Sequence, residues 1–215
     1  MTPDALRGLY VLTDPGLIPD TELAARVRQA ISGGACAVQY RDKRPGYRGH
    51  LERAGTLRAV TRELGALLII NDDPRLAVEV DADGVHLGRD DPRLQQARAL
   101  VGDRIIGVSC YDDLGRALDA ESGGADYVAF GSFHPSPTKS GTAHATRELL
   151  RRARQRLRVP IVAIGGITPE NGAPLIAAGA DALAVVSAVF SGDDPFRAAQ
   201  RFKAIMQTQP SPPRP

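Results

Sequence analysis

The sequence has few cysteines, only Cys36 and Cys110 in 215 residues. Two cysteines without paired spacing do not make a zinc site, and they give little reason to expect a catalytic thiol. Both lie in apolar, strand-like segments, GACAVQY and IIGVSC. A reduced, packed thiol is the ordinary state of such a cysteine in a cytosolic chain.

The sequence also lacks long apolar runs and blocks of like charge. No run approaches the length of a membrane span, and the first residues, MTPDALRGLYVLTD, lack the basic and apolar regions of a signal peptide. The 27 basic and 25 acidic side chains leave a net charge of +2 and are spread along the chain. We therefore expect a cytoplasmic protein that binds small molecules, and neither nucleic acid nor a membrane surface is implied.

What the sequence does contain is a series of short β-branched segments. With 43% hydrophobic residues, the chain can bury one sizeable core. Most of these segments are apolar throughout, which is typical of parallel strands covered on both faces. They are residues 9–13, 36–41, 67–70, 84–87, 105–109, 127–131, 161–165 and 182–187.

Helical periodicities separate these segments, for example Leu23, Val27 and Ile31 before the second one. Roughly eight strand–helix units in 215 residues predict an α/β fold, a single-domain (β/α)8 TIM barrel. An open doubly wound sheet would give similar local patterns.

An internal repeat favours the barrel. The segments ISGGACAVQY, ESGGADYVAF and IAAGADALAV each read as a helix end, a glycine, an alanine and a strand, so we expect Gly34, Gly124 and Gly179 to be left-handed. Their separations of 90 and 55 residues are close to four and two modules of about 25 residues. We expect the barrel to span residues 1–206. The proline-rich end, QTQPSPPRP, has no apolar face, and we expect residues 207–215 to form a disordered tail.

Polar residues follow the predicted strands. In a (β/α)8 barrel, the segments after the strands form the active face. Those segments carry Gln39, Arg41, Asp42 and Lys43; Asn71, Asp72 and Asp73; Asp90 and Asp91; Ser109; Ser136, Thr138, Lys139, Ser140 and Gly141; Gly165 and Gly166; and Val186 and Ser187.

Two of these segments predict phosphate binding. Gly165 and Gly166 allow close approach of a ligand to the backbone, and a short helix can begin at Ser187. Backbone N–H groups and a helix dipole at this place in the barrel favour an anion. The alternative is that the two glycines only permit a tight turn.

The paired aspartates predict a cation site. Carboxylates after neighbouring strands can converge on Mg²⁺ together with substrate phosphates. However, DDP occurs twice, and an Asp before Pro is a typical helix N-cap, which would explain Asp73 and Asp91 as caps. On spacing alone, Asp72 and Asp90 would then be the free carboxylates.

Arg41, Lys43 and Lys139 add positive charge to the same face. Together with the carboxylates and the glycines, they indicate two phosphate-bearing ligands, one of them bound to a metal. The histidines show no metal-ligand spacing, and His86 is expected to point into the barrel. Since no nucleophile with an adjacent base is readable, we expect a reaction dominated by charge stabilisation.

An ordered set of motifs resembles the thiamine-phosphate synthase family from about residue 8 to residue 190. The motifs are LYVLTD, VQYRDK, LIINDDPRLA, DGVHLGRDD, IGVS, YVAFGSFHPSPTK, PIVAIGGITPEN and GADALAVVSAVF. The resemblance implies a (β/α)8 barrel and a transferase of thiamine biosynthesis. It would join 4-amino-2-methyl-5-(diphosphooxymethyl)pyrimidine to a thiazole phosphate, releasing pyrophosphate. It also implies a Mg²⁺-assisted, dissociative mechanism and leaves open whether the protein is a homo-oligomer.

The resemblance implies three sets of site residues. The pyrimidine diphosphate would be bound by Gln39, Tyr40, Arg41, Asp42, Lys43, Asn71, Ser109 and Lys139, of which Arg41, Lys43, Ser109 and Lys139 would be catalytic. The thiazole phosphate would be bound by Ser136, Pro137, Thr138, Gly166, Val186 and Ser187. Mg²⁺ would be bound by Asp72 and Asp91, where the capping argument favours Asp90.

The sequence departs from the family pattern at Ser136, Arg89 and His134, and we expect His134 to pack within its loop. Two other functions share such a barrel. A thiazole tautomerase relies on a catalytic histidine and does not need the diphosphate and metal residues, which are all present here. A non-catalytic sensor of a phosphorylated ligand would not need the metal residues either.

Overall fold

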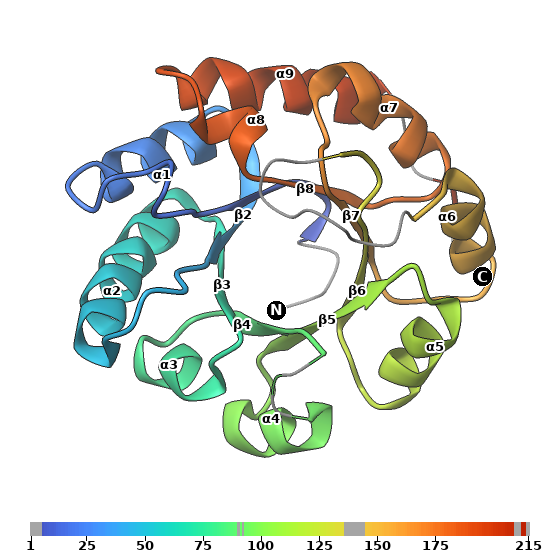
Figure 1. Cartoon of the computed structure of the whole chain (residues 1–215), viewed down its shortest axis with the longest axis horizontal. Coiled ribbons are helices and arrows are strands. Elements are labelled where there is room, and N and C mark those ends of the chain that lie inside the picture. Colours follow the sequence, from blue (N-terminus) through green and yellow to red (C-terminus); the bar gives the residue numbers. More distant parts are fainter. Residues whose placement is uncertain (1–5, 90, 92, 136–144, 209–211, 214–215) are drawn as a thin grey trace.

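Eight parallel strands pair in chain order and close into a barrel, β1 to β8 (Figure 1). The computed structural model describes residues 6–89, 91, 93–135, 145–208 and 212–213. The strands begin and end close to the predicted residues, which confirms the TIM barrel and excludes the open sheet. They are β1 (Gly8–Leu12), β2 (Ala35–Tyr40), β3 (Leu67–Asn71), β4 (Gly84–Leu87), β5 (Ile105–Tyr111), β6 (Tyr127–Phe130), β7 (Ile161–Ile164) and β8 (Ala182–Val185).

Helices surround the barrel on its outside (Figure 1). The last helix continues to Thr208, so the first two residues assigned to the tail are helical. The helices are α1 (Leu23–Ser32), α2 (Tyr47–Leu64), α3 (Pro74–Glu79), α4 (Leu94–Val101), α5 (Leu114–Ser122), α6 (Arg147–Arg154), α7 (Pro169–Ala177), α8 (Ser187–Phe190) and α9 (Pro195–Thr208). Within the described residues, no helix has the length and apolar character that a membrane span needs.

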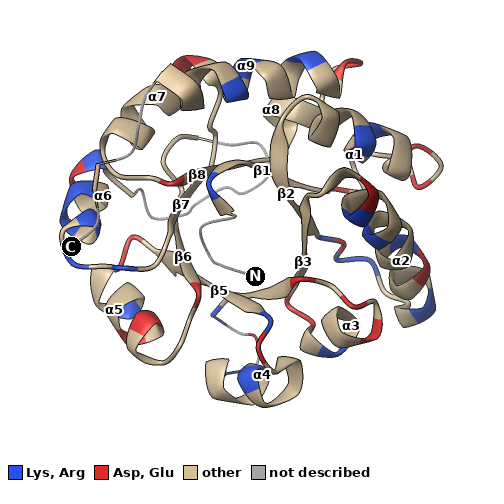
Figure 2. Ribbon diagram, turned by 180° about the vertical axis from the view of Figure 1, so that it is seen from behind, with Lys and Arg blue, Asp and Glu red and all other residues tan. Residues whose placement is uncertain are grey.

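Successive side chains of each strand point to opposite faces of the sheet, so the core has two layers. One layer fills the barrel and includes Tyr10, Leu12, Ile69 and Tyr127, while the other lies between the strands and the helices. Because both faces of each strand are covered, the strands read as continuous apolar runs. The charged residues lie mainly on the helices and on the connections, and the strand ribbons are almost free of them (Figure 2).

Three aspartates stand just before β4, β6 and β8, and each joins that strand to the preceding strand and to a helix. Asp83 accepts a hydrogen bond from Leu68 N–H at 2.8 Å and an ion pair from Arg58 at 2.8 Å. Asp126 repeats this arrangement with Ile106 N–H and Arg98, and Asp181 repeats it with Ile161 N–H and Arg154, at distances of 2.6 to 2.9 Å. The arrangement that repeats is therefore two neighbouring strands and the helix that precedes them, held together by one aspartate.

The predicted left-handed glycines are confirmed. Gly34, Gly124 and Gly179 have φ angles of 120°, 92° and 121°, and each stands two residues after the end of a helix. A side chain would be strained at such an angle. The glycines therefore permit the turn from a helix into the next strand.

Asp181→Ala is expected to lower the free energy of unfolding by about 3 to 5 kcal/mol, because Arg154 would lose its carboxylate partner while it stays buried. The Arg154 and Asp181 side chains are only 4% and 1% exposed. Urea denaturation measures the change. The matched control is Glu63→Ala, which removes an exposed partner of Arg28 and should change stability little. Equal effects of the two variants would contradict the assigned role of Asp181.

Candidate active site

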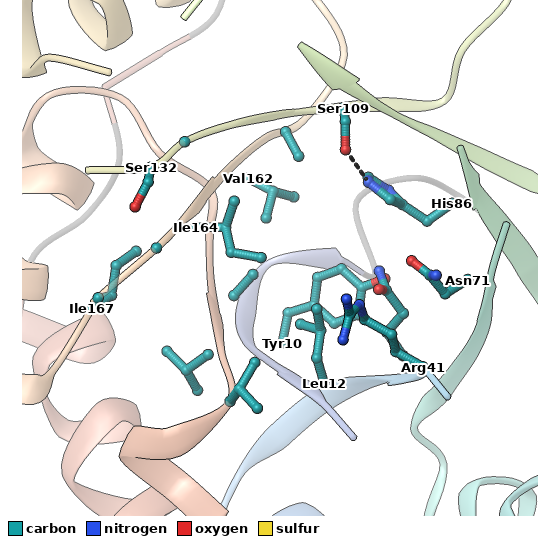
Figure 3. Close-up of a pocket in the computed structure, with 18 of the residues that line it drawn as sticks. Tyr10, Leu12, Arg41, Asn71, His86, Ser109, Ser132, Val162, Ile164 and Ile167 are labelled. Carbon is teal, nitrogen blue, oxygen red and sulfur yellow. Dashed lines mark hydrogen bonds between the residues drawn. The ribbon is translucent and has the colours of Figure 1, made fainter. Parts of the chain in front are cut away.

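A cavity of about 180 Å³ lies at the C-terminal ends of the strands. It has one polar side, with Asn71, His86 and Ser109, and an apolar side that includes Ile164 and Ile167 (Figure 3). The described residues that line it are Tyr10, Leu12, Gln39, Arg41, Asn71, His86, Ser109, Tyr111, Ala129, Gly131, Ser132, Val162, Ile164, Gly165, Gly166, Ile167, Ala184, Val185, Val186 and Ser187.

The residues at the end of β2 alternate between the cavity and the outer layer, because successive strand residues point to opposite faces. Gln39 and Arg41 line the cavity. Tyr40 is buried in the outer layer, and its hydroxyl lies 2.9 Å from Nδ1 of His50. Tyr40 and Asp42 are not among the residues that line the cavity.

Asp42 organises the loop that follows β2. Its side chain is 2% exposed and forms ion pairs with Arg44 at 2.6 Å and Arg53 at 3.2 Å. It also accepts a hydrogen bond from Arg44 N–H at 2.9 Å. Burial alone would raise the pKa of Asp42, but the hydrogen bonds and charges of the two arginines lower it to about 2. Asp42 is therefore ionised and holds the loop in place from outside the cavity.

Arg41 is held by its backbone and offers its side chain to the cavity. Thr13 Oγ1 accepts a hydrogen bond from Arg41 N–H at 2.9 Å and donates one to Arg41 C=O at 3.1 Å. No carboxylate in the described part of the chain pairs with the Arg41 guanidinium. A guanidinium without a protein carboxylate beside it is suited to an anionic ligand.

Asp72 and Asp91 come together beside the polar side of the cavity. Asp72 forms an ion pair with Lys43 and a side-chain hydrogen bond with Asp91. Asp91 also accepts a hydrogen bond from Gly88 N–H at 2.5 Å. The backbone of Asp72 is left-handed, with φ of 66°, an uncommon conformation for a residue with a side chain.

The two carboxyl groups hold a proton unequally. Burial and the hydrogen bond with Asp72 raise the pKa of Asp91 to about 6. Burial also acts to raise the pKa of Asp72, but hydrogen bonds from Asp91 and Lys43 lower it. Two carboxylates this close repel each other when both are ionised, so a proton or a cation stabilises the pair.

The capping argument is confirmed at Asp73 and wrong at Asp91. The Asp73 carboxylate accepts hydrogen bonds from Arg75 N–H and Leu76 N–H at the start of α3. In contrast, α4 begins at Leu94, and its N-cap residue is Arg93. The same DDP pattern thus has two structural roles, because α3 begins at the proline of the first one, whereas α4 begins two residues after the proline of the second one. Asp90 lies outside the described residues.

The pair of carboxylates fits Mg²⁺ chemically. Hard oxygen ligands from one or two carboxylates, completed by substrate phosphates, are a common way to bind this ion. Among the described residues, no group of three or more His, Cys, Asp or Glu side chains could hold a metal by itself. A metal at Asp72 and Asp91 would therefore need oxygen ligands from elsewhere, such as a substrate.

The opposite side of the cavity is made of backbone at two glycines. Gly165 and Gly166 are left-handed, with φ of 107° and 60°, and a Cβ atom at Gly166 would lie 2.4 Å from the Pro135 carbonyl oxygen. Glycine is therefore required here by conformation and by space, as the tight-turn interpretation expects. The same arrangement leaves backbone accessible to a ligand, so the two interpretations are compatible.

The predicted short helix is present as α8, which begins at Ser187. Its first hydrogen bond runs from Val189 N–H to Val186 C=O, at 3.2 Å. The N–H groups of Ser187 and Ala188 precede this bond, and groups at that position are the ones an anion can use. Val186 and Ser187 line the cavity next to the glycines.

Sequence analysis named Gln39, Arg41, Asn71, Ser109, Gly166, Val186 and Ser187, and the structure brings all of them to the cavity. It did not name Tyr10, Leu12 or Ser132 as lining residues. The alternation of β1 could have found Tyr10 and Leu12, but Ser132 follows the end of β6 and carries no such signal.

Four further candidates, Ser136, Pro137, Thr138 and Lys139, lie outside the described residues. His134 donates its N–H to Gly165 C=O at 3.1 Å, and its Cβ atom packs against Gly166. His134 does not line the cavity, which favours the packing role expected for it.

The Asp91 carboxyl is expected to titrate near pH 6 in the metal-free protein, because burial and Asp72 favour its protonated form. A ¹³C NMR titration of labelled aspartate side chains measures this pKa. Asp72→Asn removes the neighbouring negative charge, so the pKa of Asp91 should fall toward its ordinary value. Asp73→Asn is the matched control and should leave it in place. An unchanged Asp91 pKa in Asp72→Asn would contradict the pairing.

The fold and the site define a (β/α)8-barrel enzyme whose cavity combines the Arg41 guanidinium, with the Asp72–Asp91 pair nearby, and a backbone wall suited to phosphate. The family model described as thiamine monophosphate synthase matches residues 9–189. The chain therefore belongs to the thiamine monophosphate synthase family and is a transferase.

Individual relatives agree with this assignment. The chain is 50% identical over 205 residues to the thiamine-phosphate synthase of Thiobacillus denitrificans, covering 94% of this chain and 96% of the relative. It is 48% identical over 200 residues to that of Nitrosococcus oceani, covering 93% and 92%. The solved structure of thiamine phosphate pyrophosphorylase from Pyrococcus furiosus superposes with a TM-score of 0.87 at 38% identity, covering 96% of this chain and 98% of that one.

Proposed function

We propose that the protein condenses 4-amino-2-methyl-5-(diphosphooxymethyl)pyrimidine with a thiazole phosphate to give thiamine phosphate and pyrophosphate. The observation that carries this proposal is the composition of one cavity. Arg41 faces it without a described carboxylate partner, the Asp72–Asp91 pair lies beside it, and Gly166 and Ser187 line its far side. Two ligands that each carry phosphate would fit these two sides, one on the side of Arg41 and one on the side of Gly166 and Ser187.

The pyrimidine diphosphate would occupy the polar side. Arg41, Asn71 and Ser109 would bind it, with Gln39 deeper in the barrel. Lys43 would reach the diphosphate from its position beside Asp72. Lys139, which is not described structurally, would contribute to the same ligand. Tyr40 and Asp42 would support this group from the outer layer.

Mg²⁺ would be bound by Asp72 and Asp91. The bound ion would neutralise negative charge on the diphosphate as it leaves. Lys43 pairs with Asp72 and would remain near the same phosphate oxygens.

The thiazole phosphate would lie against the opposite wall. Backbone N–H groups at Gly166, Val186 and Ser187 would bind its phosphate, since this is the usual anion site of the fold. Ser136, Pro137 and Thr138 would complete its contacts. Whether the thiazole carries a further carboxylate is left open.

The reaction would be dissociative. The C–O bond to the diphosphate breaks, both electrons leave with pyrophosphate, and the electron-rich aminopyrimidine ring supports the cation that remains. The thiazole nitrogen then forms the C–N bond with its own lone pair, so no general base is needed. Arg41, Lys43, Ser109 and Lys139 would stabilise the developing negative charge. Val162, Ile164 and Ile167 line the cavity and would limit access of water to the cation.

Pyrophosphate release and mass detection of thiamine phosphate test the proposal. Purified protein is mixed with the pyrimidine diphosphate, with and without the thiazole phosphate and Mg²⁺. We expect coupled product only when both substrates and the metal are present. Thiazole phosphate binding without coupled product would instead favour an isomerase or a sensor. Equal activity in metal-free buffer would exclude the metal role. The cytoplasmic location expected from the sequence stays a prediction.

Arg41→Gln is expected to lower kcat/KM for the pyrimidine diphosphate by about 10²- to 10³-fold, because one preorganised charge on the leaving group is lost. Steady-state pyrophosphate release measures the effect. Arg48→Gln on α2 is the control, since the Arg48 side chain is 93% exposed and should not matter. A wild-type kcat/KM in Arg41→Gln would contradict the role proposed for Arg41.

A further inference from the structure

A chain of four hydrogen bonds crosses the inside of the barrel at the cavity. Gln39 Nε2 donates to the Tyr10 hydroxyl at 2.8 Å, which lies 3.1 Å from the Tyr127 hydroxyl. The Tyr127 hydroxyl lies 2.9 Å from His86 Nδ1. His86 Nε2 lies 2.8 Å from Ser109 Oγ (Figure 3). Four of its five members, Gln39, Tyr10, His86 and Ser109, line the cavity, and Tyr127 connects Tyr10 to His86 from beneath it.

Most of this chain is buried. Tyr10 and Tyr127 are 1% and 0% exposed, Gln39 is 3% exposed and His86 is 8% exposed. Burial raises the pKa of both phenols, so each keeps its single proton. In a buried network, every donor needs an acceptor, because an unsatisfied group costs about 1 to 3 kcal/mol.

Counting protons gives the chain a direction. The Gln39 amide group donates to Tyr10, so the proton of Tyr10 goes to Tyr127, and that of Tyr127 goes to His86 Nδ1. A neutral imidazole that accepts at Nδ1 carries its hydrogen at Nε2, which then donates to Ser109 Oγ. In the reverse direction, Tyr10 would accept twice and its own proton would have no partner.

Packing holds the His86 and Tyr127 rings in place. The His86 ring stacks on Tyr127 with centroids 5.5 Å apart and planes inclined by 25°. The Tyr127 ring crosses β5 at Gly107, where a Cβ atom would lie 1.9 Å from the ring. Only glycine leaves room for it, so the position of Tyr127 depends on this residue.

We propose that His86 is a positioning residue that accepts at Nδ1 from Tyr127 and donates through Nε2 to Ser109, leaving the hydrogen of the Ser109 hydroxyl for the substrate diphosphate. The inference rests on the proposed function for the identity of the ligand. The chemistry requires this direction, because diphosphate oxygens only accept hydrogen bonds. A Ser109 hydroxyl that donates its hydrogen bond to His86 could not donate to the diphosphate.

The tautomer of His86 tests the direction without any substrate. ¹⁵N NMR of the protein labelled at histidine distinguishes a hydrogen on Nε2 from one on Nδ1, and the His86→Gln spectrum assigns the signal among the four histidines. We expect the Nε2–H form in the wild type and a loss of this preference in Tyr127→Phe. The Nδ1–H form in the wild type would overturn the proposal.

Kinetics of Tyr127→Phe test the consequence for turnover, since Tyr127 does not line the cavity. We expect kcat for pyrophosphate release to fall on the order of ten-fold or more, with KM for the pyrimidine diphosphate little changed, because the Ser109 hydroxyl is no longer oriented. Thr61→Val is the matched control. It also removes a buried hydroxyl, which donates to Arg58 C=O on α2, and kcat should stay at the wild-type value.

A second pair of variants separates positioning from packing. His86→Gln keeps an N–H donor that can face Ser109 and should retain more turnover than His86→Leu. Equal kcat in both, or a wild-type kcat in Tyr127→Phe, would overturn the positioning role. If the wild type releases no pyrophosphate with both substrates, the proposed function fails, whereas the tautomer measurement still decides the direction of the chain.

Discussion

Pairing of β8 with β1 closes the parallel sheet, and the rest of the structure depends on this closure. In a closed barrel, alternate residues of every strand must point inward, and the ends of all strands must meet at one rim. Gln39 and Arg41 therefore reach the cavity, whereas Tyr40 and Asp42 cannot. The segment at the end of β2 is divided in the same way. Arg41 faces the cavity, whereas Asp42 supports the loop from outside through its ion pairs.

The aspartates at the two ends of the barrel differ in how their charge is balanced. Asp83, Asp126 and Asp181, at the opposite ends of the strands, are each neutralised by an arginine and stabilise the barrel. At the rim, within the part of the chain that the structure describes, Asp72 forms an ion pair with Lys43, whose charge also acts on Asp91. A site that stays electrostatically incomplete without a ligand is consistent with a reaction in which negative charge develops on a leaving group.

The polar chain inside the barrel constrains folding more than an apolar core would, since each buried phenol and the buried imidazole need hydrogen-bond partners. Its members satisfy one another, and this leaves a defined set of donors at the cavity. Gly107 contributes by leaving space rather than by contact. Support for the site thus comes from five strands, and the positions of Ser109 and Gln39 depend in part on Tyr127 and Gly107, which do not line the cavity.

The sequence by itself determined the eight strands, the barrel, the left-handed glycines and most lining residues, because apolar runs, helix ends and strand ends follow from local patterns. The family assignment rests on the same ordered motifs. Tertiary structure decided between Asp91 as a cap and Asp91 as the partner of Asp72, since identical DDP letters precede helices at different distances. It also decided which residues of QYRDK face the cavity and joined His86 to Tyr127 across the barrel, because contacts between distant strands depend on closure and register, which no local pattern contains.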